Sequence, residues 1–260
     1  MYRDIWINCH SSICSISFFN QDNFKIGSGS GFKVGNYLVT NNHVFTAPGS
    51  ANVELSFVNI DGHTTKAFKI ITYPDFQARL ESGLPENSWD FAILRLNDSE
   101  FNSIPSLTLA DSNTLAIGQR VAILGFQFEQ TNLSIKQGIL SSKYVRSSVK
   151  YLQIDASVNS GNSGGPLINA DNNRVVGMVT RKHTGLTQAF DDLIRSFDDN
   201  IAALQPAKGL MTISGFDHVE ALIATQHQMK GASRELHRSS NVGIGFAYEL
   251  EHVKDFFDHL

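Results

Sequence analysis

Ser163 is the residue best placed to carry chemistry, because it lies in the segment 161–166, which reads GNSGGP. A serine among glycines can sit on a tight turn with its hydroxyl exposed. The small neighbours also allow a substrate carbonyl to approach backbone N–H groups. Turns of this composition are common without any function. The segment therefore indicates a nucleophile only if other parts of the chain supply a base.

The segment also fits the pattern G-x-S-x-G, the nucleophile turn of α/β hydrolases, which leads from a strand into a helix. Here Pro166 follows the serine, and a second apolar run begins after the turn residues 171–173, so strand–turn–strand is expected. An α/β hydrolase also needs its acid and its histidine after the serine. The downstream candidates are Asp217, His218, His227 and His252, and none has a comparable local setting.

Two residues before the serine could complete a catalytic group. His43 closes the apolar run that begins at residue 37, and Asp90 directly precedes the apolar run 91–96. Each alone is ambiguous, because a histidine at a strand end is often structural and an aspartate before a strand is often a turn cap. Together their order along the chain is His43, Asp90 and Ser163.

This order and the residues around it resemble the chymotrypsin-like serine peptidases, whose triad runs in the same order. The resemblance is closest to the HtrA/Deg branch and covers residues 27–180 and 240–260. It rests on the segments GSGSGF at 27–32, VTNNHV at 39–44, DFAIL at 90–94, GNSGGPL at 161–167 and GIGFA at 243–247.

The resemblance implies a role for each matching residue. His43 would take the proton of Ser163, Asp90 would orient His43, and the backbone N–H groups of Gly161 and Ser163 would form the oxyanion hole. The strand that borders the substrate pocket would include Thr180, Arg181 and Lys182. Its cations would favour an acidic residue before the cleaved bond, unless they point to solvent.

Short segments rich in apolar, β-branched and aromatic residues fill the first two thirds of the chain and could hold these residues. Their spacing of about ten residues, with Gly, Asn, Asp and Pro clusters between them, favours a sandwich or barrel. The expected strands are 13–19, 31–40, 53–59, 66–72, 91–96, 120–126, 134–141, 143–147, 151–155, 165–169, 174–180 and 242–248. The fold class expected from the resemblance is mostly β, with two antiparallel six-stranded barrels. Their domains would be 1–110 and 111–260.

A helical insertion is expected within the second barrel, at about 186–239. Apolar residues recur there at steps of three and four, which is the period of an amphipathic helix. They are Leu186, Phe190, Leu193, Ile194, Phe197, Ile201 and Leu204. A second helix is expected at 216–236, and a terminal helix at 250–260. The insertion is either inert or a regulatory element that binds a partner or ligand beside the pocket.

Composition excludes several classes of protein. Among 260 residues, 42% are hydrophobic and 18% charged, which excludes a disordered chain, and a net charge of −4 argues against nucleic-acid binding. No apolar run is long enough for a membrane helix, and the N-terminus has no secretory signal pattern, so a cytoplasmic location is expected. Cys9 and Cys14 are expected to be reduced structural thiols. No metal motif is present, and the chemistry needs no cofactor.

The sequence therefore predicts a serine endopeptidase of HtrA type, without a PDZ domain, that acts on protein or peptide substrates. Two alternatives stay open at this point: a catalytically silent peptidase-fold binding protein, and an α/β-hydrolase esterase.

Overall fold

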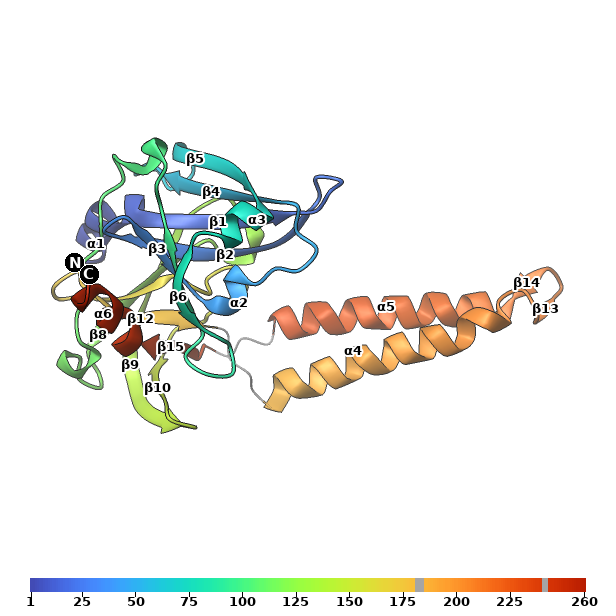
Figure 1. The fold of residues 1–260 in the computed structure, drawn as a ribbon. Coiled ribbons are helices and arrows are strands. Elements are labelled where there is room, and N and C mark those ends of the chain that lie inside the picture. The colour runs from blue at the N-terminus through green and yellow to red at the C-terminus, as the bar shows by residue number, and fades with distance from the viewer. Residues whose placement is uncertain (181–184, 240–242) are drawn as a thin grey trace. The chain divides into compact units, whose positions relative to one another are not determined.

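The computed structural model describes residues 1–180, 185–239 and 243–260 of the chain. Its contacts divide it into two units, of which the first combines Met1–Arg181 with Gly243–Leu260 and the second is Lys182–Val242. Strands are the predominant regular structure of the first unit, as expected, while the second unit is mostly helical (Figure 1). The expected boundary at residue 110 falls within the first unit, between its two β systems.

The N-terminal β system is a seven-stranded antiparallel sheet in the order β5-β4-β1-β2-β3-β7-β6. Its strands are β1 (Ile13–Phe19), β2 (Lys25–Val34), β3 (Tyr37–Thr40), β4 (Asn52–Val58), β5 (Thr65–Thr72), β6 (Leu80–Leu84) and β7 (Phe91–Arg95). The expected strand 31–40 is two strands, because Gly35 adopts a φ of 56° and turns the chain between β2 and β3.

The expectation of a closed six-stranded barrel is wrong for this sheet, because β5 and β6 remain its two edges. Between them in sequence lies the short helix α3 (Tyr73–Gln77), whose Phe76 is fully buried in the sheet's core cluster. The ring of Phe76 lies 5.7 Å from that of Phe18 and 5.4 Å from that of Phe45. An aromatic side chain thus contributes to the interior of the open sheet.

The C-terminal β system is the expected closed six-stranded barrel, in the order β10-β15-β12-β11-β8-β9. Its strands are β8 (Arg120–Gly125), β9 (Ser134–Arg146), β10 (Val149–Ile154), β11 (Pro166–Asn169), β12 (Val175–Thr180) and β15 (Gly245–Glu249). The turn between β11 and β12 forms where Asp171-Asn172-Asn173 predicts it, with Asn173 at a φ of 59°.

Alternation along the strands forms three cores. Ala92 and Leu94 of β7 point into the N-terminal sheet's own cluster, whereas Phe91 and Ile93 join a second cluster between the sheet and the barrel. A third cluster fills the barrel interior. The two β systems are therefore packed face to face, and the seam between them lies beside Asp90.

Helices at both ends of the chain pack on this seam. Helix α1 (Tyr2–Cys9) was not expected, and it buries Ile5 and Cys9, so Cys9 lies in a helix and Cys14 in a strand. Both cysteines are free and buried, and burial raises the pKa of the Cys9 thiol to about 11. Helix α6 (Glu251–Asp258) brings Phe256 against Tyr37, with ring centroids 5.3 Å apart.

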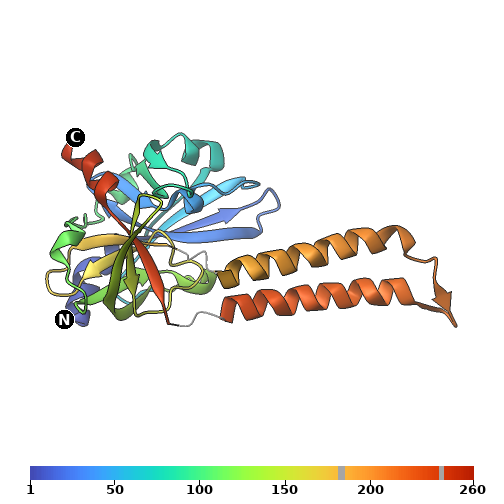
Figure 2. The same ribbon diagram turned by 90° about the horizontal axis from the view of Figure 1, so that it is seen from below.

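The second unit is an antiparallel helical hairpin, as the periodicity predicts. Helix α4 (Gly185–Leu204) and helix α5 (His218–Ser239) run side by side in both views (Figures 1 and 2). They are joined by a short ribbon of β13 (Thr212–Ile213) and β14 (Phe216–Asp217). The second helix begins two residues later than expected, because Asp217 Oδ1 accepts the N–H groups of Val219 and Glu220 as a cap.

The facing sides of the two helices pack on each other. Phe197 of α4 and Val219 and Ile223 of α5 are buried, and Asn200 is hydrogen-bonded to Gln226 across the pair. Leu193 departs from the expected apolar face, because 41% of its surface is exposed. Within the described residues, no helix combines the length and apolar character that a membrane span requires.

Candidate active site

His43 and Asp90 form a bonded pair at the ends of two neighbouring inner strands of the N-terminal sheet. His43 lies in the one-turn helix α2 (Asn42–Phe45), which directly follows β3, and Asp90 directly precedes β7. Nδ1 of His43 is 2.7 Å from Oδ2 of Asp90, and the backbone N–H of His43 donates to Oδ1 at 2.9 Å. Both carboxylate oxygens therefore fix the same histidine, which orients the imidazole.

Asp90 is held rigidly in an unusual conformation. It is fully buried, and its φ of 47° lies in the left-handed region that costs about 1–3 kcal/mol for such a residue. Its carbonyl accepts the Asn41 side-chain amide at 2.9 Å, and Thr180 Oγ1 donates to Oδ2 at 3.3 Å. A strained backbone conformation that surrounding hydrogen bonds hold in place is typical of functional sites.

Ser163 lies on the turn between β10 and β11, which continues into a strand and not into a helix. This strand–turn–strand setting in an antiparallel barrel excludes the α/β-hydrolase nucleophile turn. The serine is 6% exposed, and within the described residues its hydroxyl makes no hydrogen bond. The Ser163 carbonyl accepts the N–H of Ser30 at 2.8 Å, so strand β2 of the other β system fixes the turn.

Gly164 brings this turn against the histidine loop. Its φ is 84°, and a Cβ there would stand 2.1 Å from the Ser30 carbonyl oxygen, 2.3 Å from Thr40 Oγ1 and 3.1 Å from the Asn41 nitrogen. Only glycine fits such an approach. Because Asn41 is two residues before His43, the backbone after Ser163 is packed directly on the loop that carries the histidine.

Ser30 is a site residue that the sequence reasoning missed. It is fully buried, and its hydroxyl donates to the Gly161 carbonyl at 2.7 Å and accepts the N–H of Phe126 at 2.9 Å. Its own carbonyl accepts the Thr40 hydroxyl. One side chain thus joins the β2 strand to the nucleophile turn and to Phe126, the residue that directly follows β8. The glycine-rich composition around Ser30 was the available signal. It indicated that another part of the backbone approaches closely, but not which part.

The backbone before Ser163 is shaped to leave two N–H groups available. Gly161 has a φ of 90°, and in the described part of the chain neither its N–H nor that of Ser163 donates a hydrogen bond. The N–H of Phe128 binds the Ser160 carbonyl at 2.7 Å, which holds the preceding peptide. Two N–H groups without a partner, one of them that of the serine itself, are what an oxyanion requires.

Replacing Gly161 by alanine should disable this arrangement. A Cβ at this position would stand 2.0 Å from the Phe126 carbonyl oxygen, so the peptide must move. We expect kcat on a peptide substrate to fall by about 10²–10³-fold, the loss seen when one oxyanion donor is removed.

Gly118→Ala is the matched control for this prediction. Gly118 has a similar φ of 86° but no atom within 4 Å of its Cβ position. The Gly118→Ala variant should lose stability through backbone strain and keep the kcat of the wild type. Equal kinetics of the two variants would contradict the assignment of Gly161.

The three substrate-strand residues have different outcomes. Thr180 lies at the end of β12 and is buried against Asp90, so its side chain belongs to the triad's surroundings. Arg181 and Lys182 lie outside the described residues.

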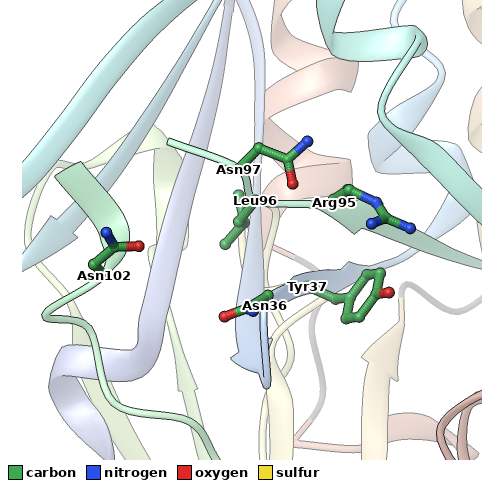
Figure 3. Close-up of a pocket in the computed structure, with 6 residues that line it drawn as sticks. All are labelled: Asn36, Tyr37, Arg95, Leu96, Asn97 and Asn102. Atoms are coloured by element: carbon green, nitrogen blue, oxygen red, sulfur yellow. The ribbon is translucent and has the colours of Figure 1, made fainter. Parts of the chain in front are cut away.

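A separate hollow of about 350 Å³ lies on the N-terminal sheet (Figure 3), and no triad residue lines it. Its only lining cation, Arg95, is hydrogen-bonded to Glu81 at 2.5 Å and lies over the Tyr37 ring. The other lining residues are Asn36, Leu96, Asn97 and Asn102. Among the described residues, no group of three or more His, Cys, Asp or Glu side chains is arranged to hold a metal ion.

The sheet carries the His–Asp pair, and the barrel packed against it carries the glycine-flanked serine. This combination defines the chymotrypsin-like class of fold and site. The chain belongs to the trypsin-like peptidase family, whose domain model matches residues 27–178. It is 32% identical over 165 residues to the probable periplasmic serine endoprotease DegP-like of Rickettsia prowazekii, covering 60% of this chain and 28% of the relative.

Other relatives confirm the resemblance to the HtrA branch. Identity is 35% over 183 residues to the serine protease HTRA4 of Mus musculus, covering 65% of this chain and 33% of the relative. It is 30% over 183 residues to the serine protease Do-like HtrA of Bacillus subtilis, covering 65% and 36%. The match thus spans about a third of the length of these relatives. Among solved structures, the HtrA-type protease AlgW with tripeptide has the same fold, with a TM-score of 0.62, 19% identity, and coverage of 99% of this chain and 62% of that chain.

Proposed function

We propose that the protein is a serine endopeptidase that hydrolyses peptide bonds in proteins or peptides. The observation that carries the proposal is the 2.7 Å His43–Asp90 pair, packed through Asn41 against the turn of Ser163. The family to which the chain belongs supports the same chemistry.

In the proposed reaction, Ser163 Oγ attacks the substrate carbonyl carbon and His43 Nε2 takes the serine proton. The carbonyl oxygen becomes an oxyanion, which the N–H groups of Gly161 and Ser163 stabilise. His43 then gives the proton to the leaving amine, and an acyl-enzyme remains. Water, deprotonated by His43, then attacks the ester carbon, and His43 returns the proton to Ser163 Oγ as the bond to the serine breaks and the acid leaves. Asp90 stabilises the imidazolium throughout and keeps its own charge.

Digestion of an unfolded protein, such as β-casein, tests the proposal. We expect internal fragments in the mass spectrum and complete inhibition after treatment with a fluorophosphonate. A wild-type chain that binds casein without cleaving it, and that forms no adduct, would favour the catalytically silent binding protein. Stepwise loss of single terminal residues would contradict an endopeptidase.

Substrate preference stays a prediction. The acidic preference expected from the sequence depends on Arg181 and Lys182, and profiling on a peptide library measures it directly. Selection of aliphatic residues before the cleaved bond would contradict the expectation.

The cytoplasmic location also stays a prediction from the sequence. The names of relatives from Rickettsia prowazekii and Pseudomonas fulva describe them as periplasmic, which favours the periplasm as the alternative. Fractionation of the native cells decides between the two, since recovery with periplasmic markers would contradict the expected location.

We further propose that the α4–α5 hairpin regulates the peptidase through a partner or ligand. The hairpin follows β12, which ends at the residue bonded to Asp90, and it precedes β15 of the same barrel. Segments in such positions can gate an active site. The alternative is a hairpin whose helices pack on each other without a regulatory role.

Replacing Phe190 and Phe197 by serine tests this regulatory role. Burial of each large side chain contributes about 1.5–3 kcal/mol, so the double variant should loosen the helix pair. We expect kcat/KM on a peptide to change at least threefold while the barrel keeps its melting temperature.

Leu193→Ser, on the exposed side of α4, is the matched control and should behave as wild type. Unchanged kinetics of the double variant, with and without candidate partners, would leave only a structural role for the hairpin.

A further inference from the structure

His252 of helix α6 contacts the two residues on either side of Asp90. The centroid of its imidazole lies 4.6 Å from that of the Trp89 ring, and the two rings meet nearly edge-on at 79°. It lies 6.3 Å from the centroid of the Phe91 ring, which is almost parallel to it at 7°. Edge-to-face and offset parallel pairs are the arrangements that aromatic rings prefer. One side chain therefore brackets Asp90 through both of its neighbours in the chain.

Helix α6 is anchored where it carries this histidine. Leu250 and Val253, which flank His252, are buried in the cluster between the sheet and the barrel. Phe91 belongs to the same cluster, and Trp89 is partly buried against it. The imidazole is therefore a fixed support for the two rings that it contacts.

The bracketed residue has a strained backbone. The φ of Asp90 is 47°, a value that residues other than glycine rarely adopt unless their surroundings enforce it. Relaxation of this angle would rotate Trp89 relative to Phe91, because φ is the rotation about the bond between N and Cα of Asp90. Two rings that rotate relative to each other cannot both keep their contacts with one imidazole. The contacts of His252 therefore oppose the relaxation.

The same relaxation would displace the carboxylate of Asp90. The N–H of Asp90 donates to the Pro85 carbonyl at 3.2 Å, which holds the preceding peptide. With this peptide fixed, rotation of φ swings Cβ and moves the carboxylate from its contacts with His43, at 2.9 and 2.7 Å. The hydrogen bonds from Asn41 and Thr180 act on Asp90 itself. The support from the imidazole is additional, because it acts through the neighbouring residues.

We propose that His252 is a positioning residue of the peptidase: it holds the two residues beside Asp90 and thereby keeps the carboxylate of Asp90 against His43. The proposal rests on the proposed peptidase function. It assigns His252 no contact with substrate and no proton transfer, so its effect reaches the reaction only through the backbone of Asp90.

Amide hydrogen exchange in the His252→Ala variant tests this role without any turnover. The N–H groups of Asp90 and His43 report the two contacts concerned, because one donates to the Pro85 carbonyl and the other to the Asp90 carboxylate. The loss of ring contacts of ordinary strength changes a local opening equilibrium about two- to tenfold, so both N–H groups should exchange faster by that factor. Wild-type exchange rates at both groups overturn the proposal, whether or not the chain cleaves proteins.

Phe256→Ala is the matched control for a general loosening of the helix. Phe256 lies in α6 as well, and it packs against Tyr37 with ring centroids 5.3 Å apart. Because this variant loses a larger ring, it should lower the melting temperature at least as much as His252→Ala. It should leave the exchange of the Asp90 and His43 N–H groups unchanged. Equal acceleration in the two variants means that a loosened helix is sufficient, which overturns the specific role of His252.

Kinetics and a conservative variant test the same role in the reaction. In His252→Ala, kcat should fall about two- to tenfold while KM changes less than twofold, because only the triad is disturbed. His252→Phe keeps a ring at the same place and should return kcat and both exchange rates to within about twofold of wild type. If His252→Phe behaves like His252→Ala, ring contact is not the cause. A loss that falls on KM contradicts a role without substrate contact.

A double-variant cycle checks that the effect passes through Trp89. In a Trp89→Leu background the closer ring contact is already absent. There, His252→Ala should accelerate exchange of the Asp90 N–H by a factor at least twofold smaller than in the wild-type background. Equal factors in the two backgrounds overturn the proposal. Should His252→Ala fail to fold, His252→Leu replaces it in every arm, because it fills the space without a ring, and the same outcomes decide.

Discussion

The variant Ser163→Ala should lose about 10⁴- to 10⁶-fold in kcat while it remains folded. The triad acts as a unit, so removal of its nucleophile leaves only the rate that the oxyanion N–H groups and substrate binding provide. The serine hydroxyl makes no hydrogen bond in the described part of the chain. We therefore expect the free energy of unfolding to change by less than about 1 kcal/mol. Peptide kinetics and thermal unfolding measure the two quantities.

Intact-mass labelling with a fluorophosphonate identifies the nucleophile independently of any substrate. The wild-type chain should gain one adduct, mapped to Ser163, and Ser163→Ala should gain none. Ser160→Ala is the control, because this exposed serine lies three residues away and should not affect labelling. An adduct on another residue, or one that forms equally on Ser163→Ala, would refute the assignment.

The sequence allows a local element to be predicted where its apolar residues follow a clear pattern and where its turn residues favour one backbone conformation. Strand β1 occupies the expected residues 13–19, and the turn at Asn173 forms where asparagine can adopt a positive φ. The pair α4 and α5 follows from apolar residues at helical spacing. The missed helix α1 has only eight residues, which is too short for a clear period.

Closure of a sheet could not be predicted in the same way, because it depends on pairing between distant strands. The same alternating strands produce a closed barrel in the C-terminal β system and an open sheet in the N-terminal one. The difference lies at the edges β5 and β6, which do not pair with each other, while Phe76 of α3 packs in the core. Period and composition say nothing about which strand ends meet.

The residues of the candidate site differ in the same way: those marked by local sequence could be predicted, and those defined by distant contacts could not. His43, Asp90 and Ser163 could be found because each lies in a short segment with distinctive neighbours. Ser30 could not, because its role is a set of contacts across the fold. Ser30 binds Gly161, 131 positions away, and Thr180 reaches Asp90 across 90 positions. Such side chains look like ordinary strand residues until the two β systems are brought together.

The variant Asp90→Asn should lose about 10⁴-fold in kcat near neutral pH and remain folded. This is the loss that follows when the triad carboxylate of such peptidases becomes an amide. The structure explains the loss through the two oxygens of Asp90, because both accept hydrogen bonds from His43. An asparagine has only one acceptor oxygen for these two donors.

The backbone decides which donor keeps the oxygen. The backbone N–H of His43 has no alternative proton state, so the amide oxygen must remain at the Oδ1 position and the NH₂ group takes the Oδ2 position. That NH₂ group faces Nδ1 of His43, which then accepts and leaves its proton on Nε2. A protonated Nε2 cannot take the proton of Ser163, so the base is lost although every group is present.

Two measurements check this chain of causes. The ring nitrogen shifts of His43 in NMR should report a proton on Nδ1 in wild type and on Nε2 in Asp90→Asn. Fluorophosphonate labelling of Ser163 should slow in parallel with kcat, because the same proton transfer activates the serine. Near-normal turnover of Asp90→Asn would show that another acid orients His43. A tautomer that stays on Nδ1 would refute the hydrogen-bond argument, even if the rate falls.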